Sequence, residues 1–342
     1  MKTSAPVKTT STSHSRASWK GEYRLLSTTT TTSPQIPKTS IGRTQNKQRW
    51  IGKRIGPYLF LLPATLFLAV FLLYPICTML LFSFEQVNIG TLLTGDLPFV
   101  GLDNYHTVLT DQLFRSSVGI SLLFTIGSLV FQFCIGFLLA LLFNRRFPLV
   151  GTMRGSVMIA WMLPIVVSGT IFKWMFQSDS GIINYALQSL GLAHTSIHWL
   201  SDPKITLWGV IIANIWIGIP FNMSLLLAGL QSISASLYEA ALVDGANAFN
   251  RFWSITLPLM RSTSLTVLML GFIYTLNVFD LIYVMTGGGP VNATEVMPLY
   301  AYNIAFEQFD LGSGSAVAVL MFLLLLVVST LYLFLIRREE VS

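Results

Sequence analysis

The side chains that could bind a small molecule gather in two apolar stretches of this sequence, residues 205–230 and 264–285. Amide and carboxylate groups there could hydrogen-bond the hydroxyls of a polyhydroxylated solute, and an aromatic ring could pack against its C–H face. The same amides could instead bond one helix to another, which is a common role of Asn in membrane bundles. Both interpretations stay open for the set, which comprises Asn214, Trp216, Asn222, Tyr274, Asn277, Asp280 and Tyr283.

The other reactive groups do not form a recognisable catalytic or metal site. His194 and His198 are four residues apart, but no third ligand lies beside them, so a zinc site is not expected. Residues 287–290 are glycine-rich but lack the Gly-Lys-Ser/Thr ending of a phosphate loop, so no ATP site or cofactor is expected. A membrane-embedded enzyme would need clustered His, Asp or Glu, and the apolar stretches contain no histidine. The sequence therefore predicts a protein without catalytic residues.

One acid, Asp280, lies within an apolar stretch, where a charge is costly and often functional. A proton relay would need a chain of partners, so we expect Asp280 to form a structural pair or to anchor the segment that follows it. An ion-gradient-driven secondary transporter of small solutes is the alternative class. It would need internal repeats and ion-binding carboxylates in mid-span, for which Asp280 is the single candidate.

Long apolar helices must position these residues. The chain of 342 residues is 53% hydrophobic and 11% charged, against about 25% charged in an ordinary soluble domain. Runs near or above the roughly 20 residues that a bilayer requires must be helical, because lipid offers no water to backbone groups. The sequence predicts an all-α polytopic membrane protein with six transmembrane helices, at about residues 55–84, 117–143, 156–176, 205–230, 264–285 and 315–336.

Several residues inside these spans carry further expectations. Prolines are expected to interrupt the helices, because each removes a backbone hydrogen bond; a broken helix often marks a transport pathway, although bundles also tolerate proline. Lys173 is expected to extend toward the headgroups. Cys77 and Cys134 are expected to be small buried side chains rather than a redox or metal pair. The prolines concerned are Pro63, Pro75, Pro164 and Pro220.

The distribution of charge predicts the orientation. Residues 1–55 carry eleven Lys and Arg against one acid, and the segments 144–155 and 231–261 contain arginines. The three remaining loops hold nine acids and two basic residues. By the positive-inside rule, both termini and the segment 231–261 are expected in the cytoplasm. The net charge of +6 therefore reflects membrane orientation and does not indicate nucleic acid as a partner.

Residues 1–54 are predicted to form a disordered basic cytoplasmic tail, because their Ser/Thr-rich and Lys/Arg-rich composition cannot bury a core. A transit peptide would have a similar composition. The basic residues next to the first span are expected to meet anionic lipid headgroups. The remaining residues, 55–338, form the predicted transmembrane domain.

A polar segment between the fourth and fifth spans, residues 231–261, is patterned like two short helices. Ser236 and Glu239 have the spacing of a capping box, which would start the first helix. Gly245 could end that helix, because glycine adopts the left-handed conformation at little cost. A second turn, rich in aromatic residues, is expected to stop at Pro258. This pattern fits a docking element for another protein, or an amphipathic helix lying on the membrane surface.

The spacing of this segment resembles the EAA signature of bacterial ABC importer permeases. Residues 239–241 are Glu-Ala-Ala, a glycine follows four residues after Ala241, and Ile-x-Leu-Pro occupies residues 255–258. Shorter matches resemble the carbohydrate-uptake branch of that family, and the resemblance covers about residues 55–338. These matches are WIGIPF at 216–221, LAGLQ at 227–231, FDLIY at 279–283, TGGGP at 286–290, Ala305-Phe306, and Asp310-Leu311-Gly312.

This resemblance implies a type I importer permease fold in which residues 231–261 form a cytoplasmic coupling helix. It also implies a bacterial inner-membrane location, a sugar or polyol as solute, and ATP hydrolysis by partner subunits. The implied partners are a second permease, two cytoplasmic ATPase subunits and an extracytoplasmic solute-binding protein. The residues implied in ATPase coupling are Glu239, Ala240, Ala241, Asp244, Gly245, Ile255, Leu257 and Pro258.

Overall fold

The computed structural model describes residues 60–340, so the predicted tail at residues 1–54 lies outside the described part. Contacts divide the chain into residues 1–63 and residues 64–342, and the second unit holds the features below. Helices are the regular structure of the described residues, where only the isolated bridges Glu85–Phe99 and Asn88–Asp310 pair extended segments. The prediction of an all-α fold is therefore confirmed.

Four helices in the described part are long and apolar enough to cross a membrane. They cover Phe60–Phe82, Gln112–Phe143 (α5), Thr206–Ser232 (α9) and Leu311–Phe334, which begins α16 (Leu311–Glu340). Two bent pairs would raise the number to six if each pair is one span: α6 (Val150–Met162) with α7 (Ile165–Met175), and Ala248–Leu259 with α13 (Arg261–Leu276). The count of six thus stays a prediction.

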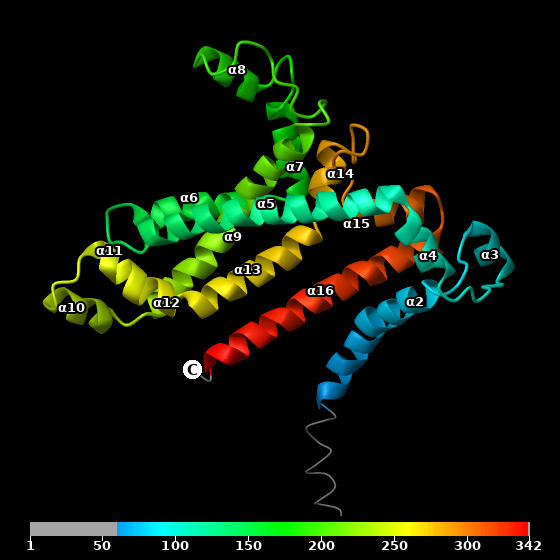
Figure 1. The fold of residues 1–342 in the computed structure, drawn as a ribbon, viewed down its shortest axis with the longest axis horizontal. Coiled ribbons are helices and arrows are strands. Elements are labelled where there is room, and N and C mark those ends of the chain that lie inside the picture. Colours follow the sequence, from blue (N-terminus) through cyan, green and yellow to red (C-terminus); the bar gives the residue numbers. More distant parts are fainter. Residues whose placement is uncertain (1–59, 341–342) are drawn as a thin grey trace, which may run out of the picture. The chain divides into compact units, whose positions relative to one another are not determined.

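Shorter helices connect these spans. Their bounds are η1 Ala69–Leu73, α2 Tyr74–Phe82, α3 Ile89–Thr94, α4 Asp103–Thr110, α8 Ile182–Ser189, α10 Ala235–Val243, α11 Ala248–Arg251, η2 Phe252–Thr256, α12 Leu257–Leu259, α14 Asp280–Met285, α15 Met297–Tyr302 and η3 Asn303–Glu307. In Figure 1, α10 and α11 lie at one end of the second unit and α3 and α4 at the other. The segments predicted to face opposite sides of the membrane are thus far apart.

Two of the predicted spans are broken rather than continuous. The third bends by 94° where Leu163 and Pro164 are extended. The fifth, predicted over residues 264–285, ends as α13 at Leu276 and restarts as α14 at Asp280. The side chain of Asn277 donates to the carbonyl oxygen of Ile273 at 2.7 Å. In a continuing α-helix that carbonyl would accept the backbone N–H of Asn277, which here bonds the carbonyl of Thr275 instead, so the side-chain amide takes the place of the next helical bond.

The prolines within the spans act in different ways. Pro164 breaks its span, as predicted, but Pro220 lies inside the continuous helix α9, so the predicted interruption there is wrong. Pro75 follows the π-helical turn η1, in which the N–H of Tyr74 bonds the carbonyl five residues back, at Ala69. In an α-helix the proline ring would clash with the carbonyl four residues before it. The wider π-helical turn before Pro75 relieves this crowding and still gives the backbone N–H of Tyr74 a hydrogen-bond acceptor.

Helices α5 and α9 form the central pair of the second unit. Helix α13 packs on both, α6 packs on α9, and α16 packs against α2, α4 and α15 (Figure 1). Three apolar clusters fill the interior, around Phe124 with Ile211, around Phe114 with Val317, and around Phe143 with Leu226 and Met260. Each cluster includes a phenylalanine of α5, so the core is distributed along that helix.

Gly136 allows α5 and α9 to approach closely. A Cβ atom at Gly136 would lie 2.8 Å from the Cβ of Asn222 and 3.0 Å from the backbone nitrogen of Met223. In contrast, a Cβ at Gly119, on the same helix, would meet nothing within 4 Å. Small residues at such crossings are a common means of packing helices in membranes.

Some single-residue expectations for the spans are wrong. Cys77 and Cys134 are free and exposed rather than buried, because both lie on outward faces of their helices. Lys173 donates to the carbonyl oxygen of Val284 at 3.0 Å, which links α7 to α14 instead of reaching toward headgroups. The surfaces that these helices expose in the single chain are rich in large apolar side chains.

The glycine-rich residues 287–290 lie in a turn region that follows α14. The hydroxyls of Thr286 and Thr294 lie 2.8 Å apart, and Thr294 also donates to the carbonyl of Gly289. Beside this turn Glu295 is buried, and Asn303 donates to its Oε1 at 2.7 Å. Burial raises the pKa of the Glu295 carboxyl, which the hydrogen bond from Asn303 opposes.

Candidate functional site

The segment 231–261 folds as two short helical elements joined by a sharp turn, as predicted. Helix α10 (Ala235–Val243) is followed by α11, which continues through η2 and α12 to Leu259. We call residues 234–259 the coupling loop, after the role that the sequence resemblance implies for them. Figure 1 shows α10 and α11 at the edge of the bundle. Several apolar side chains of this loop are exposed, including Val243 at 89% and Phe249 at 68%. The loop therefore presents an apolar surface that the other described residues do not cover.

The start of α10 differs from the predicted capping box. Its N-cap is Ser234, which makes no side-chain cap bond, and Ser236 already lies within the helix. The hydroxyls of Ser234 and Ser236 instead lie 2.7 Å apart. Glu239 is exposed and has no hydrogen bond or ion pair among the described residues. Its carboxylate is thus available to a partner and does not stabilise the first turn of the helix.

The end of α10 is the glycine turn that the sequence predicts. Gly245 has φ +79° and donates to the carbonyl of Leu242 at 3.1 Å, while Ala246 donates to that of Ala241 at 2.8 Å. This pair of bonds forms a Schellman motif. A Cβ at Gly245 would meet nothing within 4 Å. Glycine is therefore needed here for the backbone conformation and not for space.

The second element runs past Pro258, so the predicted stop at that residue is wrong. The π-helical turn η2 precedes Pro258, and the N–H of Leu257 bonds the carbonyl five residues back, at Phe252. The helix then bends by 62° into α13 at Met260, which is fully buried. The hydroxyl of Tyr238 lies 2.9 Å from that of Thr256, which ties α10 to η2.

The eight predicted coupling residues fall in two groups. Glu239, Ala240, Asp244 and Gly245 are exposed, and Ala241 is partly buried, on α10 and the turn that follows it. The second group, Ile255, Leu257 and Pro258, lies on η2 and α12. The first group lies at the edge of the bundle, and the second, in which Leu257 and Pro258 are also exposed, lies on the helix that leads into the bundle.

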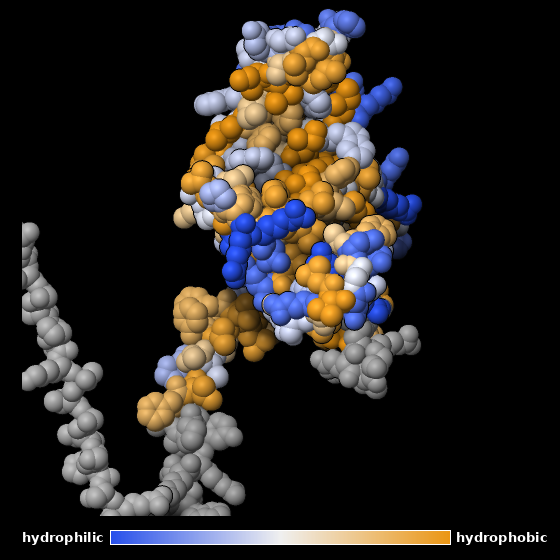
Figure 2. Space-filling model, turned by 90° about the vertical axis from the view of Figure 1, so that its left-hand side faces the viewer, coloured by the Kyte–Doolittle hydropathy of each residue, from blue (hydrophilic) through white to orange (hydrophobic). Residues whose placement is uncertain are grey.

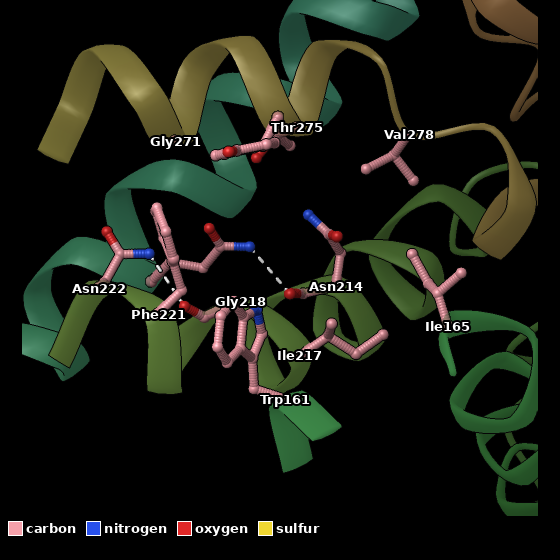
Figure 3. A pocket seen from close by; sticks show the side chains of 12 residues that line it. Trp161, Ile165, Asn214, Ile217, Gly218, Phe221, Asn222, Gly271, Thr275 and Val278 are labelled. Carbon is pink, nitrogen blue, oxygen red and sulfur yellow. Dashed lines mark hydrogen bonds between the residues drawn. The ribbon is translucent and has the colours of Figure 1, made fainter. Parts of the chain in front are cut away.

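A pocket of about 310 Å³ lies between α5, α6, α9 and α13 (Figure 3). We call it the bundle pocket. Three of the seven predicted solute-pathway residues line it, namely Asn214, Asn222 and Tyr274. No charged side chain lines it among the described residues. The other lining residues are Gln132, Trp161, Ile165, Ile217, Gly218, Phe221, Gly271, Thr275 and Val278.

Buried amides form the polar part of the bundle pocket. Gln132 donates to the carbonyl of Asn214 at 2.8 Å, and Asn222 donates to that of Gly218 at 2.9 Å (Figure 3). The Nδ2 of Asn214 and the Oδ1 of Asn222 are buried without a hydrogen-bond partner in the described part of the chain. A buried polar atom without a partner is costly. The pocket therefore offers one donor and one acceptor to an uncharged polar ligand.

Aromatic rings also line the bundle pocket. Tyr274 is 62% exposed and packs edge-on against Phe221, with ring centroids 5.4 Å apart. Phe221 in turn contacts Trp161 at 6.2 Å. Amides and aromatic rings in one pocket can hold a ligand that has both hydroxyl groups and an apolar C–H face.

The structure places the other four predicted pathway residues elsewhere. Trp216 packs against Phe172, and the amide of Asn277 bonds its own helix. Asp280 is exposed at the start of α14, and the structural pair expected for it is absent among the described residues. Tyr283 stacks on Phe279 in a separate aromatic group. The break between α13 and α14 removes the shared helical face expected for Asn277 and Asp280.

Sequence reasoning missed Gln132 and Trp161 as lining residues. Gln132 is the one carboxamide side chain in the predicted span 117–143, and a lone amide in an apolar run is a signal of a polar site. Trp161 gives no comparable signal, because an indole in a span fits many environments. No group of three or more His, Cys, Asp or Glu in the described residues could hold a metal ion.

Comparison with known proteins gives concordant matches. The family described as binding-protein-dependent transport system inner membrane component matches residues 132–341. The sulfoquinovosyl glycerol transport system permease protein of Agrobacterium fabrum is 36% identical over 314 residues, which cover 89% of this chain and all of the relative. The trehalose/maltose transport system permease protein of Thermococcus litoralis is 38% identical over 288 residues, covering 84% and 95%.

A solved structure has the same fold. It is a bacterial ABC transporter involved in the import of the acidic polysaccharide alginate, and its matching chain has a TM-score of 0.74 at 24% identity. The match covers 85% of this chain and 99% of the other. The described helices are thus arranged as in an importer permease.

Proposed function

Because this chain belongs to the family of binding-protein-dependent transport system inner membrane components, we propose that it is a permease subunit of an ATP-binding-cassette importer for a sugar or related polyol. It is a multi-pass membrane transport component and not an enzyme. Two relatives more than 35% identical are named for the transport of sulfoquinovosyl glycerol and of trehalose or maltose, and these names support a sugar or polyol as the solute.

The coupling loop is the observation that carries the proposal. It holds the residues of the EAA signature on a preformed helix–turn–helix with exposed apolar side chains and an unpaired carboxylate at Glu239. The loop docks on one of two cytoplasmic ATPase subunits, and a second permease covers the apolar faces of the spans. An extracytoplasmic solute-binding protein delivers the solute. ATP hydrolysis takes place in the partner subunits, and this chain transmits the movement that accompanies it.

The bundle pocket lies on the proposed solute pathway. Its lack of charged side chains suits a neutral hydroxylated solute, and its amides and aromatic wall supply the two kinds of contact that such a solute needs. An ion-driven carrier would need carboxylates in mid-span, and Asp280 lies at a helix start outside this pocket. The ATP-driven importer is therefore the function that these observations favour.

We expect the substitution Tyr274→Ala to change the solute dependence of transport without loss of assembly. Tyr274 forms the exposed part of the aromatic wall, and loss of one aromatic contact of about 1 kcal/mol weakens binding several-fold. The measurement is the solute-stimulated ATP turnover of reconstituted complexes as a function of solute concentration. Tyr274→Phe, which keeps the ring, serves as the control and should stay near wild type. An unchanged concentration dependence in Tyr274→Ala would exclude this ring from the pathway.

A cysteine-labelling experiment tests the proposed orientation. In a background without Cys77 and Cys134, which are both exposed, a cysteine at Asn247 should stay unlabelled by a membrane-impermeant thiol reagent in intact cells. A cysteine at Asp179 should react. Both positions are exposed in the chain, so accessibility to solvent is matched. The reverse pattern would place the coupling loop outside the cell and would contradict the proposed docking on ATPases.

A further inference from the structure

A second pocket lies between the coupling loop and the ends of two long helices. Its volume is about 410 Å³, and it is lined by the C-terminal ends of α5 and α9 on one side and by α10, α11 and η2 on the other. We call it the basic pocket. Figure 2 looks onto this end of the molecule and shows hydrophilic residues gathered there below a largely apolar surface. The bundle pocket has no charged lining residue, so the two pockets differ in chemistry.

Two arginines give the basic pocket its charge. Arg145 follows the end of α5, and Arg251 is the last residue of α11. No acidic residue lines the pocket among the described residues. Neither arginine side chain has a hydrogen bond or an ion pair within the described part of the chain, and the Nε of Arg251 is fully buried. A buried guanidinium donor without a partner is costly, so an anion in the pocket would remove an energetic penalty.

A third arginine, Arg154, binds the end of α5. Arg154 donates through Nη2 to the carbonyl oxygen of Phe143, in the last turn of α5. The carbonyl end of a helix carries partial negative charge, which would otherwise attract the guanidinium of Arg145 nearby. Since Arg154 already binds that end, the fold leaves the positive charge of Arg145 and Arg251 for a ligand from outside.

Further donors line the same pocket. The amide of Asn144 belongs to its wall, as do the hydroxyls of Tyr238 and Thr256, which lie 2.9 Å apart and by bonding each other leave one hydroxyl proton for a ligand. A planar guanidinium matches the oxygen geometry of a phosphate group, and hydroxyl and amide donors complete the coordination of such a group. The pocket also lies where α5 and α9 end, which is the depth at which lipid headgroups meet a transmembrane protein.

From these features we propose that the basic pocket binds a phosphate group, supplied by an anionic phospholipid headgroup or by a soluble phosphate. Its walls come from the bundle and from the coupling loop, so a bound phosphate bridges Arg145 on the bundle side with Arg251 and Tyr238 on the loop side. The ligand thereby holds the coupling loop against the bundle. This site is separate from the bundle pocket, and it shares α10 with the proposed ATPase-docking surface through Tyr238.

Binding to the purified full-length chain tests the proposal. Native mass spectrometry would count the lipids retained from micelles that contain phosphatidylglycerol or phosphatidylcholine. Equilibrium dialysis with radiolabelled inorganic phosphate would test the soluble source. We expect Arg145→Gln with Arg251→Gln to weaken binding about tenfold or more, because hydrogen bonds to charged groups are the stronger kind. Arg146→Gln, an exposed neighbour that does not line the pocket, is the matched control and should bind as wild type does.

Each outcome bears on the proposal. Selective retention of phosphatidylglycerol identifies a headgroup, and binding of inorganic phosphate alone identifies a soluble source. If the double variant fails to fold, Tyr238→Phe keeps the ring and should weaken binding about threefold through the lost hydroxyl. Equal binding by wild type and the pocket variants would overturn the proposal. Failure of the wild type to bind either ligand would also overturn the proposal. If in that case the double variant loses ATPase association, the arginines pair with a carboxylate of the ATPase and not with a phosphate group.

Discussion

The substitution Gly245→Val is expected to abolish most of the solute-stimulated ATP turnover of the assembled transporter, while the subunit still inserts and pairs with the second permease. The φ of +79° is open to glycine but costs a residue with a Cβ roughly 1–2 kcal/mol, and more for a β-branched side chain. No atom lies within 4 Å of the new Cβ, so the damage arises from the backbone alone. The Schellman turn would shift, and with it the angle between α10 and α11.

Two controls separate this effect from general destabilisation. Gly245→Asn should keep most of the activity, because asparagine tolerates the left-handed conformation. Gly95→Val introduces the same strain at a φ of +74°, also without a neighbour within 4 Å, but at the end of α3. It should leave co-purification with the ATPase subunits unchanged. Full stimulated turnover in the reconstituted Gly245→Val complex would refute the role assigned to the coupling loop.

The substitution Gly136→Val is expected to have the largest effect on folding. The added Cβ would lie 2.8 Å from the Cβ of Asn222 and 3.0 Å from the nitrogen of Met223, and neither atom can move without shifting α9. Overpacking of a closed core costs about 1–3 kcal/mol, and displacement of the central helix pair also disrupts the bundle pocket. The thermal unfolding midpoint of the purified subunit should fall, and little protein should accumulate in the membrane.

Gly119→Val is the matched control for this prediction. It places the same β-branched residue on the same helix, where nothing lies within 4 Å. Both variants therefore change helix propensity equally, and only Gly136→Val creates a clash. Equal unfolding midpoints for the two would show that the α5–α9 contact does not limit stability.

The sequence predicts the long helices well, because an apolar run of bilayer length can hardly adopt another structure. It predicts their interruptions poorly. Pro164 and Pro220 look alike in the sequence, yet one breaks its span and the other lies in a continuous helix, since the outcome depends on neighbouring helices. Asn277 ends α13 through a bond from its own side chain, which is one of several options open to an asparagine.

The sequence also predicts some features of the candidate sites and not others. Gly245 was identified because a left-handed turn requires a particular residue type, and the structure confirms that turn. The cap assigned to Ser236 and Glu239 was wrong by two residues, because Ser234 offers the same side chain at the true start of α10. The bundle pocket draws Gln132 from α5 and Asn214 from α9, and the sequence alone gives no pairing between distant spans.

The bend at Met260 joins the second element of the coupling loop to α13 at an angle of 62°, so the two helices can act as the two arms of an angled lever. One arm, Ala248–Leu259, measures about 18 Å, and the other, Arg261–Leu276, about 24 Å, at 1.5 Å per residue. With Met260 buried at the corner, a rotation that displaces the outer arm by about 3 Å would displace the far end of the inner arm by about 4 Å. Tyr274 and Thr275 lie toward the far end of that inner arm, so under the proposed function a force applied to the loop would be redirected and slightly amplified at this part of the pocket wall.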